Sequence, residues 1–187
     1  MIRVTELLRW GGIVPDIPNV PAVTEALKRG TAVHEWSLEI EDKVEKGKRR
    51  QVLLAMPEKL RSYGEAVANF HEQLRPAWMD REVRIDDLEL GITGCPDRYG
   101  AVRGEPTVLD FKTGQEQGWH RFQLAIYAIL LKRDRRDTDA RLCVYLRKDG
   151  TFRMVRHQSD VDMLAAWTLI KEWRDRSNEA IGDQVTH

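Results

Sequence analysis

Two carboxylates and a lysine near the middle of the chain have types and spacing that could do chemistry. Pro96-Asp97 stands shortly before the segment Asp110-Phe111-Lys112, which closes a largely apolar run, residues 107–112. Because side chains of a strand alternate between its faces, Asp110 and Lys112 would share one face. If this strand pairs with a preceding strand that ends at Pro96, Asp97 joins them. Two acids and a lysine around one point suit metal-assisted hydrolysis of a phosphodiester bond.

Each of these groups has a role in such a reaction. Hard cations such as Mg²⁺ prefer carboxylate oxygens, and a bound ion polarises a phosphate and lowers the pKa of a water molecule. A second ion, typically about 3.5–4 Å away, would stabilise the leaving oxygen. A lysine beside the ions would orient or deprotonate the attacking water and offset charge in the transition state. The alternative for Asp110 and Lys112 is a structural ion pair, and the D-x-K tripeptide alone does not separate the two.

The elements that must position these residues follow one another as helices, three strands, a helix, two strands and a helix. The patterns predict helices over residues 3–10, from about Pro21 to Val44 with a softening at Gly30, within 51–75, over 116–133 and over 160–177. They predict strands at Glu82–Ile85, 88–93, 107–112, 141–146 and 152–156, with a turn at 100–105 and a frayed tail. This order indicates an α+β fold with a mixed α/β sheet. We expect one domain, with a helical part (1–78), a catalytic core (79–157) and a C-terminal helix and tail (158–187).

Composition limits the classes of function. The 187 residues are 42% hydrophobic and 32% charged, with zero formal net charge, which suits a folded domain. The sequence has no apolar run of about 20 residues and no signal-like N-terminus, so we expect a cytoplasmic protein without a membrane partner. Cys95 and Cys143 are the only cysteines, too few for a four-thiolate zinc or iron–sulfur site. No phosphate-binding G-x-x-x-x-G-K-[ST] motif is present, so ATP is not an expected cofactor.

Pro96-Asp97 with Asp110-Phe111-Lys112 resembles the signature of the PD-(D/E)XK nuclease superfamily. Further motifs resemble its RecB-like and phage-type exonuclease branch. They are Gly30-Thr31-Ala32-Val33-His34 as G-x-x-x-H, Gly114 after the lysine as in D-x-K-T-G, and Gln123 with Tyr127 as Q-x-x-x-Y. The order and spacing agree over roughly residues 25–157.

The resemblance implies a restriction-endonuclease-like αβββαβ core, DNA as the substrate, and Mg²⁺ or Mn²⁺ as one or two bound ions. It implies metal ligands at His34, Asp97, Asp110 and the Phe111 carbonyl, with Asp97 bridging two ions. It also implies that Lys112 serves the attacking water, that Gln123 positions water or phosphate, and that Tyr127 contacts the DNA backbone. Cleavage would leave a 5′-phosphate and a 3′-hydroxyl.

Simpler interpretations stand beside these roles. His34 could be a helix-face histidine bonded to a core carbonyl, Gln123 an internal amide cap, and Tyr127 a core tyrosine. An additional site acid could be Glu82 or Glu65, although either could be solvated. The basic segment Lys48-Arg49-Arg50 could contact DNA or form a solvated turn.

The leading hypothesis is a metal-dependent DNA exonuclease of phage or prophage type, acting in recombination or repair inside a bacterial cell. The resemblance suggests a single-strand annealing protein as a partner. One alternative is a structure- or site-specific endonuclease of the same fold, and another is a non-catalytic DNA-binding or scaffold module with a degenerate core. The sequence leaves polarity, strand preference, processivity and oligomeric state open.

Overall fold

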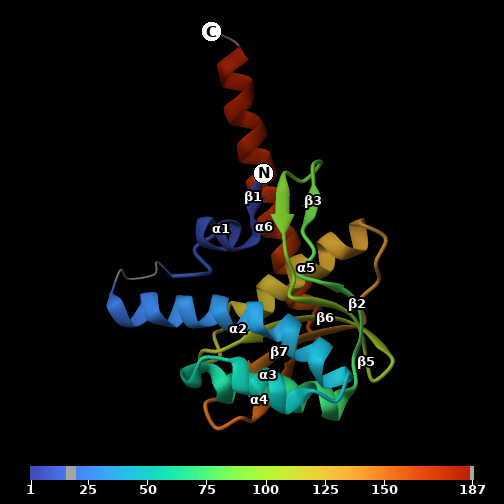
Figure 1. Cartoon of the computed structure of the whole chain (residues 1–187). Helices are drawn as coiled ribbons and strands as arrows, with labels where there is room; N and C mark the ends of the chain where they lie inside the picture. The colour runs from blue at the N-terminus through green and yellow to red at the C-terminus, as the bar shows by residue number, and fades with distance from the viewer. Residues whose placement is uncertain (16–19, 186–187) are drawn as a thin grey trace.

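The computed structural model describes residues 1–15 and 20–185, and these ranges form an α+β structure, as predicted (Figure 1). The helices are α1 (Val4–Trp10), α2 (Pro21–Glu45), α3 (Arg49–Ala55), α4 (Arg61–Leu74), α5 (His120–Arg133) and α6 (Asp160–Val185), with a short 3₁₀ turn at Glu58–Leu60. The strands are β1 (Ile2–Arg3), β2 (Ala77–Arg81), β3 (Ile85–Asp87), β4 (Ile92–Gly94), β5 (Arg98–Val102), β6 (Glu105–Lys112), β7 (Ala140–Leu146) and β8 (Phe152–Arg156). None of the helices in the described ranges combines the length and apolar character that crossing a bilayer requires.

The main sheet has the strand order β2-β5-β6-β7-β8, and β1, β4 and β3 form a smaller sheet beside it. In the main sheet β6 and β7 are parallel and the other neighbours are antiparallel. A parallel pair needs a crossover, which here contains α5. Helices α2, α3 and α4 cover one face of the sheet, and α1, α5 and α6 lie on the other side (Figure 1). Strand β6 is buried on both faces, because Val108 packs with the α5 side and Leu109 and Phe111 pack with the α2 side.

Helix α2 carries the G-x-x-x-H motif along the end of β6. It begins at Pro21, where a missing N–H costs little because first-turn N–H groups have no helical partner. The helix continues through Gly30 without a break, so the predicted softening there is wrong. A Cβ atom on Gly30 would lie 3.8 Å from Thr113 Oγ1, in ordinary contact. Gly30 therefore marks where α2 passes the end of β6.

The strands before β6 differ most from the sequence predictions. Glu82 has a left-handed backbone (φ 53°) and lies between β2 and β3, so the predicted strand at Glu82–Ile85 is wrong. Residues 88–91 form the turn between β3 and β4 rather than the beginning of a strand. The predicted turn at 100–105 is largely β5 and the start of β6. Gly100 was misleading because its place is in the sheet, where a Cβ atom would come within 2.2 Å of the Ala77 carbonyl oxygen.

The elements after β6 agree with the predictions more closely. Strands β7 and β8 form a hairpin whose turn contains Asp149-Gly150, and Gly150 has the positive φ (80°) that favours glycine. Helix α5 begins at His120 rather than at residue 116. Helix α6 continues to Val185, beyond the predicted end at residue 177, so the prediction of a frayed segment from 178 onward is wrong as far as Val185.

Candidate active site

Strands β5 and β6 bring Asp97 and Asp110 together. Asp97 directly precedes β5, where Arg98 pairs with Leu109 of antiparallel β6, so Asp97 and Asp110 are the next opposed residues. The predicted convergence of the carboxylates is therefore present, although Pro96-Asp97 leads into a strand rather than ending one. Both residues are buried, with 6% of Asp97 and 3% of Asp110 exposed.

Lys112 connects the carboxylates to α5. Its Nζ forms an ion pair with Asp110 Oδ2 and donates a hydrogen bond of 2.9 Å to Gln123 Oε1. Gln123 Nε2 in turn donates to the Tyr127 hydroxyl at 3.1 Å, as the four-residue helical spacing allows. Four of the predicted site residues thus form one continuous polar chain. The same ammonium lies 5.4 Å from the ring centroid of Trp119, a contact that limits the positions open to Lys112.

His34 joins α2 to both strands. Its Nδ1 lies 3.0 Å from Asp97 Oδ1, and its Nε2 lies 3.1 Å from the Phe111 carbonyl oxygen. The Phe111 N–H donates to the other Asp97 oxygen at 2.6 Å. Since both partners of the imidazole are acceptors, only the protonated ring, which donates from both nitrogens, satisfies them together.

The charges of the site explain its pKa values. Burial acts to lower the pKa of His34, but the charge and hydrogen bond of Asp97, with help from Asp110, raise it to about 9. Burial acts to raise the pKa of Asp97, but His34, Lys112 and the Phe111 N–H hold it below its usual value. Burial and the Asp97 charge raise the pKa of Asp110 to about 6. Burial acts to lower the pKa of Lys112, which Asp110 and Asp97 nevertheless raise, so this amine is an ammonium at neutral pH.

A buried arginine, Arg98, donates a hydrogen bond to the backbone of Asp97. The sequence patterns did not single it out. Arg98 is 0% exposed, and its Nε donates to both carboxylate oxygens of Glu41 at 3.0 Å. Its other nitrogens donate to Ser37 Oγ and to the Asp97 carbonyl, each at 2.6 Å. Ser37 and Glu41 follow His34 at three and seven positions, on the same face of α2. That spacing, with an arginine next to Asp97, is the signal that could have found them.

The two candidate extra acids lie in different places. Glu82 is near the site, because its N–H donates to the Asp97 carbonyl at 2.9 Å and its Oε1 is 3.9 Å from Arg98 Nη1. That Oε1 is buried and has no hydrogen-bond partner among the described residues. Glu65 lies instead against Gly150 in the β7–β8 turn, where its Oε2 would be 2.8 Å from a Cβ atom on the glycine.

The basic segment Lys48-Arg49-Arg50 lies beyond the far end of α2. The helix continues from His34 to Glu45, which is about 16 Å at 1.5 Å per residue. Arg49 donates to Asn69 Oδ1 at 2.8 Å and forms an ion pair with Glu72, so its charge is already used within the protein. Lys48 and Arg50 are exposed.

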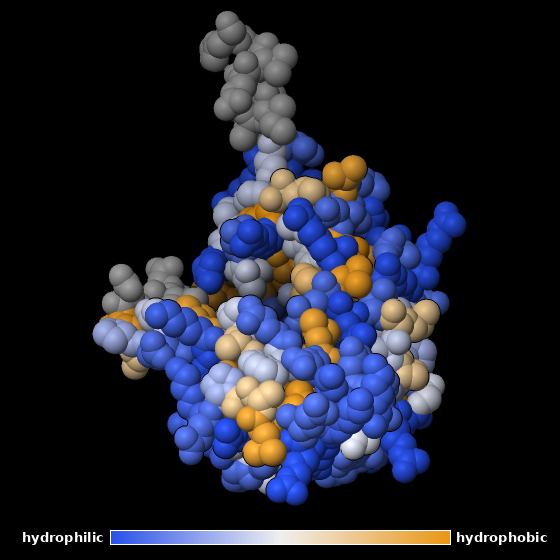
Figure 2. Space-filling model, in the orientation of Figure 1, coloured by the Kyte–Doolittle hydropathy of each residue, from blue (hydrophilic) through white to orange (hydrophobic). Residues whose placement is uncertain are grey.

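Figure 2 shows a hollow above α2, on the side where helix α5 crosses behind (Figure 1). A cavity of about 200 Å³ borders Tyr127 and Cys95, and Arg3 and Arg84 also line it. The side chains of His34 and Lys112 are 27% and 18% exposed, so both polar groups are partly open to solvent.

The donor atoms fit a divalent cation. Two carboxylates, a carbonyl and an imidazole suit such an ion, and cis ligands of an octahedral Mg²⁺ lie about 3 Å apart. The 3.0 Å contact between His34 Nδ1 and Asp97 Oδ1 is a hydrogen bond of the protonated ring, so His34 would have to release a proton in order to ligate an ion. Asp110 is only 3% exposed and its Oδ2 pairs with the Lys112 ammonium, so a divalent ion held by Asp110 would lie directly beside this charge. Across residues 1–15 and 20–185, however, no three His, Cys, Asp or Glu side chains already form a metal-binding cluster.

Opposed carboxylates beside a lysine, on a mixed sheet between helices, define a nuclease-like centre. The family model described as "PD-(D/E)XK nuclease superfamily" matches residues 11–181, and the chain belongs to this superfamily. A crystal structure of a candidate exonuclease from Eubacterium rectale is similar, with a TM-score of 0.50 and 13% identity over 91% of this chain and 71% of the other. At that identity the likeness shows the fold alone. The structure of SSO0001 gives a TM-score of 0.38 with 16% identity, over 90% of this chain and 82% of the other. No curated protein matches the sequence.

Proposed function

We propose that the protein is a DNA exonuclease that depends on Mg²⁺ or Mn²⁺ and leaves 5′-phosphate and 3′-hydroxyl products. The observation that carries the proposal is the buried juxtaposition of Asp97 and Asp110 with Lys112, which Gln123 holds from α5. A purely structural ion pair needs one acid for one lysine. Here a second buried acid lies opposite the first, and the neighbouring histidine belongs to a separate helix.

His34, Asp97, Asp110 and the Phe111 carbonyl would hold the metal. When bound, a divalent ion polarises the scissile phosphate and lowers the pKa of a coordinated water. The raised pKa of Lys112 keeps this side chain charged, so of its two proposed roles it fits orienting water and offsetting phosphate charge rather than removing a proton. Gln123 accepts a hydrogen bond from Lys112 and thereby fixes the direction of the ammonium. Tyr127 is a positioning residue in this scheme, because its hydroxyl accepts from Gln123.

The exonuclease part of the proposal rests on the G-x-x-x-H and Q-x-x-x-Y motifs, whose residues His34, Gln123 and Tyr127 lie around Asp97, Asp110 and Lys112. By the same resemblance we propose a phage-type role in recombination or repair, with a single-strand annealing protein as a partner. Processing of DNA ends is the activity that such a role requires.

One digestion experiment tests the proposal. Linear DNA labelled at either end and covalently closed circles are incubated with Mg²⁺, with Mn²⁺ and with a chelator. We expect stepwise loss of label from linear DNA only, and none with the chelator. Cutting of closed circles would refute the exonuclease assignment in favour of an endonuclease, and cleavage in the chelator would refute the metal requirement.

Matched variants separate the site from general damage. Asp97→Asn, Asp110→Asn and Lys112→Met should each lose at least about 100-fold in rate, the scale of removing a group that stabilises transition-state charge. Asp175→Asn and Lys171→Met make the same chemical changes on exposed positions of α6 and should stay active. Full activity of Lys112→Met would contradict the assigned role, and circular dichroism checks that each variant is folded.

A further inference from the structure

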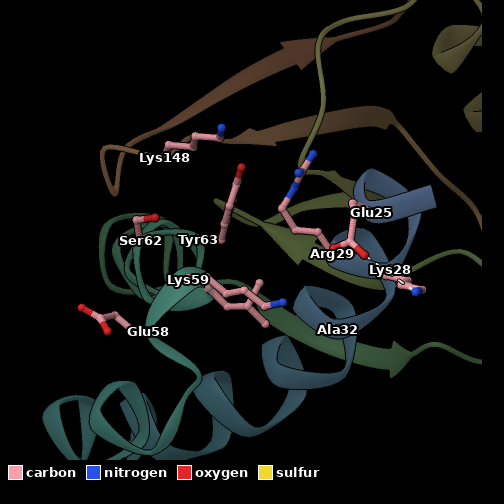
Figure 3. Close-up of a pocket in the computed structure, with 10 residues that line it drawn as sticks. Glu25, Lys28, Arg29, Ala32, Glu58, Lys59, Ser62, Tyr63 and Lys148 are labelled. Carbon is pink, nitrogen blue, oxygen red and sulfur yellow. Dashed lines mark ion pairs between the residues drawn. The ribbon is translucent and has the colours of Figure 1, made fainter. Parts of the chain in front are cut away.

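A second concave feature lies between the first half of α2, the start of α4 and the β7–β8 turn (Figure 3). Its volume is about 740 Å³, within the range of about 300–1,000 Å³ for ligand pockets. The charged residues of its lining are Lys28, Arg29, Lys59 and Lys148, with Glu25 and Glu58. None of these residues belongs to the site described above. We call this feature the basic pocket.

The basic pocket lies at the same edge of the sheet as the carboxylates. Arg29 directly precedes Gly30, where an added Cβ atom would lie 3.8 Å from Oγ1 of Thr113, the residue after Lys112. Lys148 follows the end of β7, which runs parallel to β6 and beside it. Both the C-terminal end of β6 and the β7–β8 turn therefore face the same side of the molecule. A nucleic-acid strand bound at the carboxylates could therefore extend along this side of the molecule to the basic pocket.

Most of the cationic side chains of the basic pocket have no acidic partner within the described residues. Within the described ranges, Arg29, Lys59 and Lys148 form no ion pair, and Lys28 lies 3.7 Å from Glu25. Ten of the other arginines do pair with acids within the described ranges. The basic pocket thus keeps a local positive charge in a protein with zero net charge, which favours an anionic ligand.

The geometry of the lining favours a phosphate over a base. Figure 3 shows the tips of Arg29, Tyr63 and Lys148, from three different elements, directed into the same space. The Arg29 guanidinium carbon lies 5.6 Å from the Tyr63 ring centroid, and Arg29 Nε is buried without a hydrogen-bond partner among the described residues. Tyr63 is only 2% exposed, so its ring cannot serve as a stacking platform for a base. Its hydroxyl and the cations instead offer donors of the kind that bind phosphate oxygens.

We propose that the basic pocket binds a phosphate of the nucleic-acid strand under cleavage, at a distance of one or more nucleotides from the scissile bond. The proposal rests on the nuclease function proposed above and adds a positioning subsite to it. Contacts to backbone phosphates fix the register of a strand without reading its sequence. The phosphate could be the strand terminus or an internal phosphodiester, and the same donors would serve either.

Equilibrium binding in a chelator tests the subsite without any cleavage. A fluorescent single-stranded DNA is titrated with wild type, with Lys59→Ala/Lys148→Ala, and with the control Lys132→Ala/Lys171→Ala. All four lysines are exposed, and the control pair lies on α5 and α6, across the sheet. Each lost phosphate contact removes about 0.7 from the slope of log K against log salt for a single strand. For Lys59→Ala/Lys148→Ala we therefore expect a salt dependence less steep by about 0.7–1.4 and binding about 5- to 25-fold weaker at 0.1 M salt. The control variant should bind as the wild type does.

The form of the DNA identifies the source of the phosphate. If the variant's loss of affinity appears only with 5′- or 3′-phosphorylated ends, the subsite takes the terminus. An equal loss with hydroxyl-ended and circular single strands shows that it takes an internal phosphate. Unchanged affinity and salt slope in Lys59→Ala/Lys148→Ala would overturn the subsite while leaving a cleaving wild type intact. A wild type that neither binds nor cleaves DNA would overturn the nuclease function and the subsite together.

Discussion

Replacing Arg98 by methionine is the sharpest test of how the fold holds its site. The side chain is fully buried, and all its described hydrogen bonds go to Glu41, Ser37 and the Asp97 carbonyl. Methionine fills much of the same space with no charge. The variant therefore leaves the carboxyl group of Glu41, which is only 1% exposed, with no close cation except Arg81, whose Nη1 is 3.9 Å away.

The expected loss has two parts. Removing one partner of a buried ion pair costs about 3–5 kcal/mol of unfolding free energy. The second part depends on pH. Burial already raises the pKa of Glu41 to about 7 although Arg98 opposes the rise, so without Arg98 the pKa must rise further. A carboxyl group with a higher pKa in the folded than in the unfolded protein does not change the free energy of unfolding below the unfolded-state pKa. As pH rises from that value towards the folded-state pKa, the group lowers the free energy of unfolding. The free energy of unfolding of the wild type therefore levels off above about pH 7, whereas that of the variant continues to fall by about 1.4 kcal/mol per pH unit.

Urea unfolding followed by circular dichroism at pH 5, 7 and 8 measures both parts. From pH 7 to pH 8 the variant should lose about 1.4 kcal/mol and the half-ionised wild type about 0.4 kcal/mol, so we expect the difference between them to grow by about 1 kcal/mol. The double variant Glu41→Leu/Arg98→Met removes the buried acid as well, and should recover most of the stability and lose the extra pH dependence. A difference that is the same at all three pH values, or no recovery in the double variant, would refute the assignment of Glu41 and Arg98 as a coupled buried pair.

Three further predictions concern the site and its approach. With metal chelated, the protonated His34 (pKa about 9) should add up to about 3 kcal/mol to the free energy of unfolding. This contribution is complete below pH 6.5 and disappears as pH rises through 9. The urea midpoint of the wild type should therefore fall over this pH range, and that of His34→Gln should not. Gln123→Leu removes the acceptor that holds Lys112, so kcat should fall about 10- to 100-fold while DNA affinity in chelator stays the same, and unchanged kcat contradicts the role. Gly30→Ala has room and gains helix propensity, so it should raise stability by about 0.5–1 kcal/mol, whereas Gly100→Ala meets a backbone carbonyl and should cost about 2–3 kcal/mol; thermal melts that rank them the other way disprove the packing argument.

Local periodicity explains why much of the fold was predictable. Helix α2 from Pro21, the segment β6, and the β7–β8 hairpin each carry their own signal within a few residues. The strands between residues 77 and 102 were misplaced because they are short and because Gly100, which permits close strand pairing, resembles a turn residue. Whether Asp97 follows one strand or precedes the next depends on the pairing of β5 with β6. No local sequence pattern contains this information.

The candidate site divides along the same line. The sequence by itself determined the chemical groups and their local faces, since the strand period places Asp110 with Lys112 and the helix period places Gln123 with Tyr127. Only the tertiary structure decided that Glu41 and Ser37 of α2 bind Arg98, which donates to the Asp97 carbonyl.

The basic residues divide in the same way. Tertiary structure alone shows that Arg49 is paired with Glu72, while Arg29 and Lys148 line one pocket. The physical reason is distance: the effect of a charge depends on neighbours within a few ångströms, and those neighbours come from segments far apart in the chain.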